Sequence, residues 1–301
     1  MATPPRRVLP GTLYLVTRRC SERRYFLRPS KVTDEVVLYV LAVAAQRYGV
    51  LVHAFCVLSN HLHLVLTDLD GQLPAFMQYL DSLIARAVNT SLGRFEGFWA
   101  SDGSYSAVEP LASADVVAKA AYVLANPVAA GLVRRGSEWP GLWTSPEQLR
   151  RGARLAARRP KVFFDPKGYL PESLELELST PRGFASAEEF GSLVLEALLP
   201  LEEQHRREAQ SSGRRFLGAA RVLAQSPFVR PRAAEPRFDL KPRVASRDRW
   251  KRVEGLLRLK TFLREYRDAW ARRRAGEASV IFPAGTYLLR VLHGVQCAGA
   301  A

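Results

Sequence analysis

A pair of histidines in a short apolar segment constrains the fold of this chain more than any other feature. Residues 60–67 read Asn-His-Leu-His-Leu-Val-Leu-Thr, a pattern typical of a β-strand entered from a tight turn at Ser59–Asn60. Side chains alternate between the two faces of a strand, so His61 and His63 lie on one face and the intervening leucines on the other. The leucine face predicts packing against helices in a hydrophobic core. The histidine face has no comparable packing role.

Two histidines separated by one residue are close enough to share one divalent metal ion, with a third ligand supplied from elsewhere in the fold. The alternative is a half-exposed strand whose histidines are merely tolerated. Because the flanking positions are strongly apolar, we expect a central strand rather than an edge strand. That position favours a pair of metal ligands.

The composition argues against several classes of protein. No apolar run in the 301 residues approaches the ~20 residues that a membrane-spanning helix needs, and the first ten residues lack the apolar centre of a secretory signal. The three cysteines are widely spaced, so neither a disulfide framework nor a cysteine zinc site is indicated; they are Cys20, Cys56 and Cys297. We therefore expect a cytoplasmic protein without membrane association, folded as one large or two modest domains.

The chain carries a net charge of +15, and the excess is concentrated in its second half. Residues 1–150 hold 15 Lys and Arg against 12 Asp and Glu, whereas residues 151–301 hold 29 against 17. Most of the excess is arginine, whose planar guanidinium forks onto phosphate. A basic half joined to a near-neutral half indicates a region that holds a polyanion beside a region that performs chemistry. High-GC codon usage, which enriches Arg and Ala, is the alternative cause.

The segments around the histidines predict a regular order of strands and helices. Strands are expected at 11–19 and 50–58, the second pairing with the histidine strand as a hairpin, and a further strand ends near Val108. Helices are expected at 33–48 and 73–92, each closed by a glycine. Five arginines from the end of the first strand onward cluster around two aromatic residues, which suits a phosphate backbone with unstacked bases, although a solvated loop fits equally well; they are Arg18, Arg19, Arg23, Arg24 and Arg28.

Another helix is expected from Asp115 to Asn126, with Ser113 as its N-cap. Its polar residues recur at spacings of four, three and four and form one stripe on an otherwise apolar helix; they are Asp115, Lys119, Tyr122 and Asn126. A stripe this narrow faces either solvent or an active site. Pro127 lacks an N–H and disfavours helical geometry at the preceding residue, so we expect the helix to end or kink at Asn126.

These pieces combine into one chemical hypothesis. A metal ion held by His61, His63 and the amide oxygen of Asn126 would keep positions open for a phosphate group. Tyr122 would then be the nucleophile, although a phenol with a pKa near ~10 is weak unless it is positioned against a polarised phosphodiester. This is the logic of covalent DNA strand cleavage, in which the tyrosine attacks phosphorus and a 3′-hydroxyl leaves. A purely structural tyrosine is the alternative.

Residues 8–145 resemble the HUH-type single-tyrosine transposases, particularly the REP-associated tyrosine transposases of bacteria. The matching motifs occur in the family's order and separations and cover nearly half of the chain. They are Pro10-Gly11-Thr12-Leu13-Tyr14, Leu58-Ser59-Asn60-His61-Leu62-His63-Leu64, Tyr122-Val123-Leu124-Ala125-Asn126-Pro127-Val128 and Ala130-Gly131-Leu132-Val133. Ala129 departs from the family pattern, because a basic residue often stands there, and the change is expected to weaken a DNA contact.

The resemblance implies an α+β fold with a ferredoxin-like antiparallel sheet and helices on one face, followed by a mainly helical basic region. It also implies that His61 and His63 bind Mg²⁺ or Mn²⁺ and that Asn126 completes the ligand set. Tyr122 would form a 5′-phosphotyrosine with single-stranded or hairpin DNA. No small-molecule substrate is expected, and the oligomeric state is left open.

Beyond the catalytic domain at 8–145, we expect a connector at 146–245 and a basic C-terminal region at 246–301. The connector would contain a helix from Ser186 to about Leu199, a short helix within 214–225, and an extended linker at 227–242. Ser246–Arg274 predicts a basic amphipathic helix that packs its apolar side on the domain and offers cations to DNA phosphates, unless it serves only for docking. The candidate DNA-binding residues outside the first arginine cluster are Lys119, Arg249, Lys251 and Arg252.

The sequence is compatible with three candidate functions. The leading one is a metal-dependent strand transferase acting on single-stranded, hairpin-forming repeats. The second is a domesticated DNA-binding protein that keeps the fold and no longer cleaves. The third is a metal-dependent phosphodiesterase that uses water, with Tyr122 structural. Only the first yields an oligonucleotide linked to tyrosine.

Overall fold

The computed structural model describes residues 4–101, 104–231 and 242–299. Its N-terminal part confirms the expected order of strand, helix, strand, strand, helix and strand. These elements are β1 (Thr12–Arg19), α1 (Lys31–Arg47), β2 (Val50–Leu58), β3 (His61–Asp68), α2 (Leu73–Ser91) and β4 (Ser106–Pro110), with a 3₁₀ turn, η1 (Ser21–Arg23), after β1.

The sheet has the strand order β2-β3-β1-β4-β7. The first four strands pair antiparallel, and β2 and β3 form the expected hairpin, in which Leu58 faces His61 across the turn. The α+β class is confirmed. One detail differs from the expected antiparallel sheet, because the two-residue strand β7 (Val244–Ala245) pairs parallel with β4 and makes the sheet mixed.

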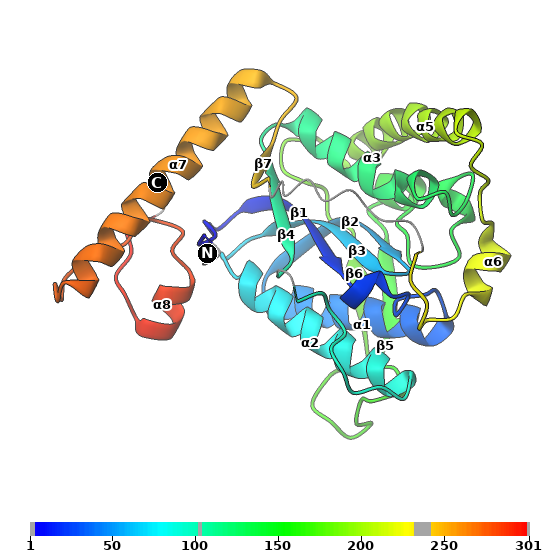
Figure 1. Ribbon diagram of the computed structural model, residues 1–301, viewed down its shortest axis with the longest axis horizontal. Helices are drawn as coiled ribbons and strands as arrows, with labels where there is room; N and C mark the ends of the chain where they lie inside the picture. The colour runs from blue at the N-terminus through cyan, green and yellow to red at the C-terminus, as the bar shows by residue number, and fades with distance from the viewer. Residues whose placement is uncertain (1–3, 102–103, 232–241, 300–301) are drawn as a thin grey trace.

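Helices cover both faces of this sheet. Figure 1 shows α1 and α2 on one side, with α3 (Ser113–Ala129) and α5 (Ala187–Ser211) on the other. The sequence predicted helices on one face of the sheet only. Helices α1 and α2 do lie on one face, but α3 covers the other face, on which the histidines lie. The reason is visible in β3, where every residue after His61 is buried, so that neither face of this central strand is left to solvent.

Helix α3 differs from its expected ends at both termini. Ala112 occupies the N-cap position and no side chain caps the helix, so Ser113 is not the cap. At the other end the helix continues past Pro127 to Ala129. Pro127 costs one backbone hydrogen bond, and burial of the last turn offsets that cost, since both Pro127 and Val128 are buried. Asn126 consequently lies inside the helix and not at its terminus.

The connector contains more regular structure than expected. A two-stranded sheet of β5 and β6 was not predicted, and α5 runs well beyond Leu199, across Pro200. The expected cap at Ser186 is confirmed, because its hydroxyl accepts from the Glu189 N–H at 3.1 Å. The remaining elements are η2 (Gly136–Glu138), α4 (Pro146–Arg150), β5 (Arg154–Arg158), β6 (Ser173–Glu177) and α6 (Ala219–Ala224). Of the expected linker at 227–242, residues 232–241 lie outside the described residues.

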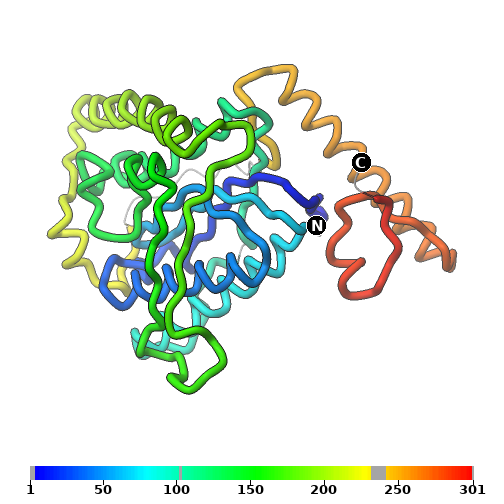
Figure 2. Tube along the Cα trace, turned by 180° about the vertical axis from the view of Figure 1, so that it is seen from behind, coloured from blue at the N-terminus to red at the C-terminus, as the bar shows by residue number. Residues whose placement is uncertain are grey.

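The C-terminal helices α7 (Arg249–Arg274) and α8 (Leu288–His293) extend to one side of the sheet-containing body in both views (Figures 1 and 2). They share a small second core formed by Ala269, Val280, Phe282 and Val295. The expected packing of an apolar side of α7 on the body is largely absent, because only Gly255, Phe262 and Ala269 of this helix are buried. Within the described residues, no helix combines the length and apolarity needed to cross a membrane.

A third histidine, His53 on β2, illustrates how burial sets protonation in this fold. Its Nδ1–H donates to the Ser179 carbonyl at 2.7 Å, and its Nε2 accepts from the Thr67 hydroxyl at 2.8 Å. Both contacts suit the neutral ring. Burial lowers the pKa of His53 to about 4, partly opposed by the Ser179 contact.

We expect His53 to make folding stability depend on pH. Its folded pKa lies below the unfolded value near ~6.5, so its contribution is intact above that pH and is lost as the pH falls toward 4. Between pH 7 and pH 5 the loss is on the order of 2 kcal/mol. Urea denaturation of the parent and of His53→Gln measures it. An equal decrease in both proteins would show that another group is responsible.

Candidate metal site and nucleophile

The pairing of β1 with β3 builds the candidate site. Thr17 lies directly opposite His63 and Arg19 directly opposite His61. Residues paired across antiparallel strands point to the same face, so these four side chains gather on one patch of the sheet. The two imidazole rings meet edge to face, with 4.7 Å between their centroids. The two histidines that the sequence predicted to act together therefore lie side by side.

Asn60 fixes which nitrogen of His61 carries the proton. Its Nδ2 donates to the Arg23 carbonyl at 3.2 Å, which orients the amide so that Oδ1 faces His61 Nδ1 at 2.6 Å. An amide oxygen only accepts, so Nδ1 must be the donor. The lone pair of His61 therefore resides on Nε2, the nitrogen that a metal ion would use. Sequence reasoning treated Asn60 only as a turn residue.

His63 is held in a similar way and leaves one nitrogen unsatisfied. Its Nδ1 contacts the Thr17 hydroxyl at 2.9 Å. Its Nε2 is buried, and no described residue meets it with hydrogen-bond geometry, although the Asn126 side chain lies near enough to raise the pKa of the ring. Leaving such an atom unpaired costs on the order of 1–3 kcal/mol. An orphaned imidazole nitrogen next to a second imidazole is the arrangement that a metal ion would satisfy.

Both imidazoles are kept neutral, which is the form that binds metal. Burial lowers the pKa of His61 to about 3, and the cations of Arg19 and Arg23 lower it further. Burial also holds the pKa of His63 well below its usual value, with His61 and Arg19 adding to the effect and the Asn126 side chain opposing it.

Helix α3 brings Tyr122 and Asn126 to the same patch. The Tyr122 ring lies edge to face with the His63 ring, with 5.7 Å between centroids, and 43% of the tyrosine is exposed. Asn126 is buried, and its Nδ2 donates to the Tyr122 carbonyl at 2.8 Å. This bond commits the amide nitrogen to the helix and leaves Oδ1 as the ligand atom. The C-terminal part of the polar stripe, Tyr122 and Asn126, therefore faces the histidines.

In the part of the chain that the structure describes, no cluster of three or more His, Cys, Asp or Glu side chains is placed to hold a metal ion. The candidate ligand set rests on two imidazoles and one amide oxygen. Such a set carries no charge, so a bound divalent ion would keep its full charge toward a phosphate.

The first arginine cluster is divided by strand alternation. Arg18 lies on the face opposite the histidines, where its Nε pairs with Asp81 at 2.9 Å and both side chains are largely buried. This placement favours a structural role for Arg18. Arg19 is exposed on the histidine face. Arg23 lies close enough to His61 to depress its pKa, and Arg24 pairs with Glu22 at 2.9 Å.

We expect Arg18 and Arg19 to respond oppositely to the same substitution. Arg18→Gln leaves the Asp81 carboxylate unpaired and should lower the free energy of unfolding by about 3 kcal/mol, with little effect on DNA affinity of the folded protein. Arg19→Gln should weaken DNA binding and cost less than about 1 kcal/mol of stability. Urea denaturation and fluorescence anisotropy measure the two effects. The reverse pattern would place the DNA on the other face.

The remaining predicted DNA-binding residues fall into two groups. Lys119 lies beside the nucleophile candidate, with Nζ 6.0 Å from the centroid of the Tyr122 ring. Burial lowers the pKa of Lys119, while Asp115 opposes that shift and Arg247 adds to it. The second group lies at the start of α7 and is exposed; its members are Arg249, Lys251 and Arg252.

Two solved structures are similar to this chain. One is a REP-associated tyrosine transposase bound to a REP hairpin, at 17% sequence identity and a TM-score of 0.40 over 47% of this chain and 81% of that chain. The other is a candidate transposase from Deinococcus radiodurans R1, at 18% identity and a TM-score of 0.28 over 36% and 85% of the two chains. No protein-family model and no curated protein matches the chain. Likeness at this level carries no argument about function.

Proposed function

We propose that this protein is a metal-dependent DNA strand transferase that cleaves and rejoins single-stranded, hairpin-forming DNA through a phosphotyrosine at Tyr122. One observation carries the proposal. The ring of Tyr122, a residue that is 43% exposed, lies against His63, whose buried Nε2 has no partner among the described residues. A partly exposed tyrosine beside an unsatisfied metal-ligand atom suits attack on a phosphodiester.

His61, His63 and Asn126 would hold a divalent ion, Mg²⁺ or Mn²⁺. When bound, that ion would supply positive charge that stabilises the phosphoryl oxygens as negative charge develops on them. The residues fit this role because both imidazoles are neutral. In His61, the contact with Asn60 leaves Nε2 for the ion, and in His63 the buried Nε2 has no partner among the described residues.

The protein's own groups would then carry out the transfer. The Tyr122 oxygen attacks phosphorus as its proton leaves, a bond forms between them, and the bond from phosphorus to the 3′-oxygen breaks. The departing 3′-oxygen takes up a proton and becomes a hydroxyl. Attack of a 3′-hydroxyl on the phosphotyrosine reverses these steps and rejoins a strand, so no external energy source is needed. Arg19 and Lys119, near the histidines and the phenol, would hold the flanking phosphates.

The choice of single-stranded, hairpin-forming DNA rests on the sequence motifs shared with the REP-associated tyrosine transposases. The exposed arginines and aromatic residues of the chain are compatible with it, since unpaired bases stack on aromatic rings while phosphates bind guanidinium groups.

Covalent trapping tests the proposal directly. Labelled single-stranded oligonucleotides that contain a hairpin are incubated with the protein and Mn²⁺ or Mg²⁺ and separated on a denaturing protein gel. A labelled protein band that depends on metal is expected, with the modified peptide containing Tyr122. Cleavage without that band would support the hydrolytic alternative, and binding without cleavage would support the domesticated DNA-binding alternative.

A further inference from the structure

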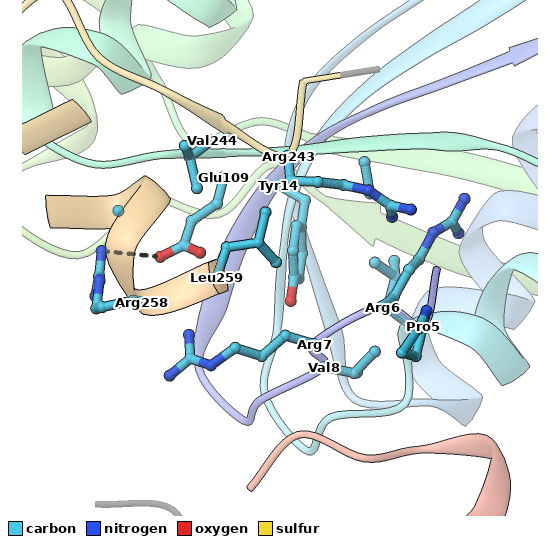
Figure 3. Close-up of a pocket in the computed structure, with 13 residues that line it drawn as sticks. Pro5, Arg6, Arg7, Val8, Tyr14, Glu109, Arg243, Val244, Arg258 and Leu259 are labelled. Carbon is cyan, nitrogen blue, oxygen red and sulfur yellow. Dashed lines mark ion pairs between the residues drawn. The ribbon is translucent and has the colours of Figure 1, made fainter. Parts of the chain in front are cut away.

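Figure 3 shows a cavity lined by arginines. Strand alternation places it on the opposite face of the sheet from the histidines. Tyr14 of β1 lines it and sits three residues before Thr17, so the two side chains point to opposite faces. Tyr14 is also five residues, about 17 Å, along β1 from Arg19. The N-terminal segment, β1, β4, the residues around β7, and α7 together form the walls. This cavity is therefore separate from the candidate metal site.

The charge of the cavity is strongly unbalanced. Arg6, Arg7, Arg243 and Arg258 line it, and Glu109 is the one carboxylate among the described residues of the lining. Glu109 is engaged with Arg258, at 3.9 Å between the charged atoms. Three further arginines thus line a cavity of about 40 Å³, which is space for a few water-sized groups. Such an arrangement favours an anion.

The positive charge of Arg243 is not paired with any described residue. Its side chain is half-buried and, among the described residues, has neither a hydrogen-bond nor an ion-pair partner. Burial lowers the pKa of Arg243, and the nearby cation of Arg6 lowers it further. Keeping two like charges together away from bulk water costs free energy that a bound anion would recover.

Arg6 is held in place by its own contacts. Its guanidinium donates to the Tyr105 carbonyl and to the Ser104 hydroxyl, and it stacks 3.6 Å above the Tyr105 ring. Figure 3 shows the side chains of Arg6 and Arg243 extending to the same side of Tyr14. The guanidinium group of Arg6 is therefore oriented, whereas the N–H donors of Arg243 are not committed to a described residue. Guanidinium groups present paired N–H donors, which match the oxygen atoms of a phosphate.

We propose that Arg6 and Arg243 form a second phosphate-binding site, which holds the backbone of single-stranded DNA away from the point of cleavage. The inference rests on the proposed function for its ligand. Phosphodiester is favoured over free phosphate because α7 forms one wall of the cavity and continues beyond it as a basic, exposed helix. Trp250, 74% exposed near the start of α7, offers a stacking surface for a base of the same strand.

Binding measurements in a protein that cannot cleave isolate this site. In a Tyr122→Phe background without added metal, anisotropy of a labelled single-stranded oligonucleotide is followed over a series of salt concentrations. Arg243→Gln is expected to weaken affinity about tenfold and to reduce the slope of log affinity against log salt by about 0.7, since one phosphate contact is lost. An unchanged slope would overturn the proposal.

Arg86→Gln is the matched control, because it removes the same charge from an exposed position about 20 Å along α2 from the cavity residue Leu73. It should leave affinity and slope unchanged. Arg243→Lys keeps the charge without the fork, so it should retain the salt slope and lose part of the affinity. Thermal unfolding of each variant verifies folding. If Arg243→Gln is unstable, Arg243→Lys decides the test, because an affinity equal to that of the parent in this variant would overturn the proposal.

Two further results separate the possible outcomes. If inorganic phosphate raises the melting temperature of the parent but not of Arg243→Gln, while DNA affinity is equal in both, the cavity holds a small phosphate and the DNA assignment falls. If Arg243→Gln weakens DNA binding but the chain with Tyr122 forms no covalent adduct, the second site stands and the proposed transferase function falls.

Discussion

Tyr122→Phe is expected to abolish both DNA cleavage and the covalent protein–DNA adduct while leaving DNA binding intact. The substitution removes one oxygen atom and preserves the ring that packs edge to face against His63. Binding depends on arginine contacts and stacking, which the phenol oxygen does not supply. Because water is not positioned to replace the lost nucleophile, activity should fall to the limit of detection. Denaturing electrophoresis measures cleavage and adduct, and anisotropy measures binding.

Tyr105→Phe provides the matched control. Tyr105 is a buried tyrosine whose ring packs under Arg6. Because the next residue, Ser106, pairs with Thr17 on the histidine face, the Tyr105 side chain points to the opposite face, and Tyr105→Phe should still allow the adduct to form at Tyr122. If the adduct survives in Tyr122→Phe and disappears in Tyr105→Phe, the nucleophile has been assigned to the wrong residue. If Tyr122→Phe cleaves DNA at the parent rate without an adduct, Tyr122 is structural and water is the nucleophile.

His61→Ala should reduce metal-dependent cleavage by about 100-fold or more, because it removes one of the two imidazoles that would hold the ion. His63→Ala should have at least as large an effect. The two variants should differ in stability, since His61 is only half-buried whereas His63 is 3% exposed and lies beneath α3. His63→Ala leaves a small cavity there and should lower the melting temperature. Metal titration of cleavage, together with thermal unfolding, measures both effects.

Thr17→Val tests the metal assignment without removing a ligand. It breaks the contact between the Thr17 hydroxyl and His63 Nδ1 and keeps the size of the side chain. Loss of a partner that orients a metal-binding histidine typically weakens metal affinity by roughly 10–100-fold. Cleavage by this variant should therefore need a higher Mn²⁺ concentration.

If His61→Ala cleaves at the parent rate at every metal concentration, the histidines have no role in holding a metal ion.

Local patterns in the sequence determined the first half of the fold. Alternation along β3, the amphipathic spacing of α2 and the hairpin at Ser59–Asn60 are properties of neighbouring residues, so they were readable without a structure. The same holds for the stripe that placed Tyr122 and Asn126 on one side of α3. The strand alternation and the helix stripe together predicted that the two histidines, the tyrosine and the asparagine form one site.

Only the tertiary structure decided which of those residues meet. The register of β1 against β3 put Thr17 beside His63 and sent Arg18 and Arg19 to opposite faces. Packing of α3 over the histidine face kept the helix intact through Pro127, against the local preference of that residue. Propensity is a small energy per residue, and burial of a whole helix end outweighs it.

The cationic cavity shows the limit of sequence reasoning most clearly. Arg6 and Arg243 are 237 residues apart in the sequence, and no pattern in either segment indicates that they converge. Their meeting depends on β7 adding to the edge of the sheet beside β4. Such long-range pairings are determined by the tertiary fold. The basic composition of the second half indicated only that this region could bind a polyanion.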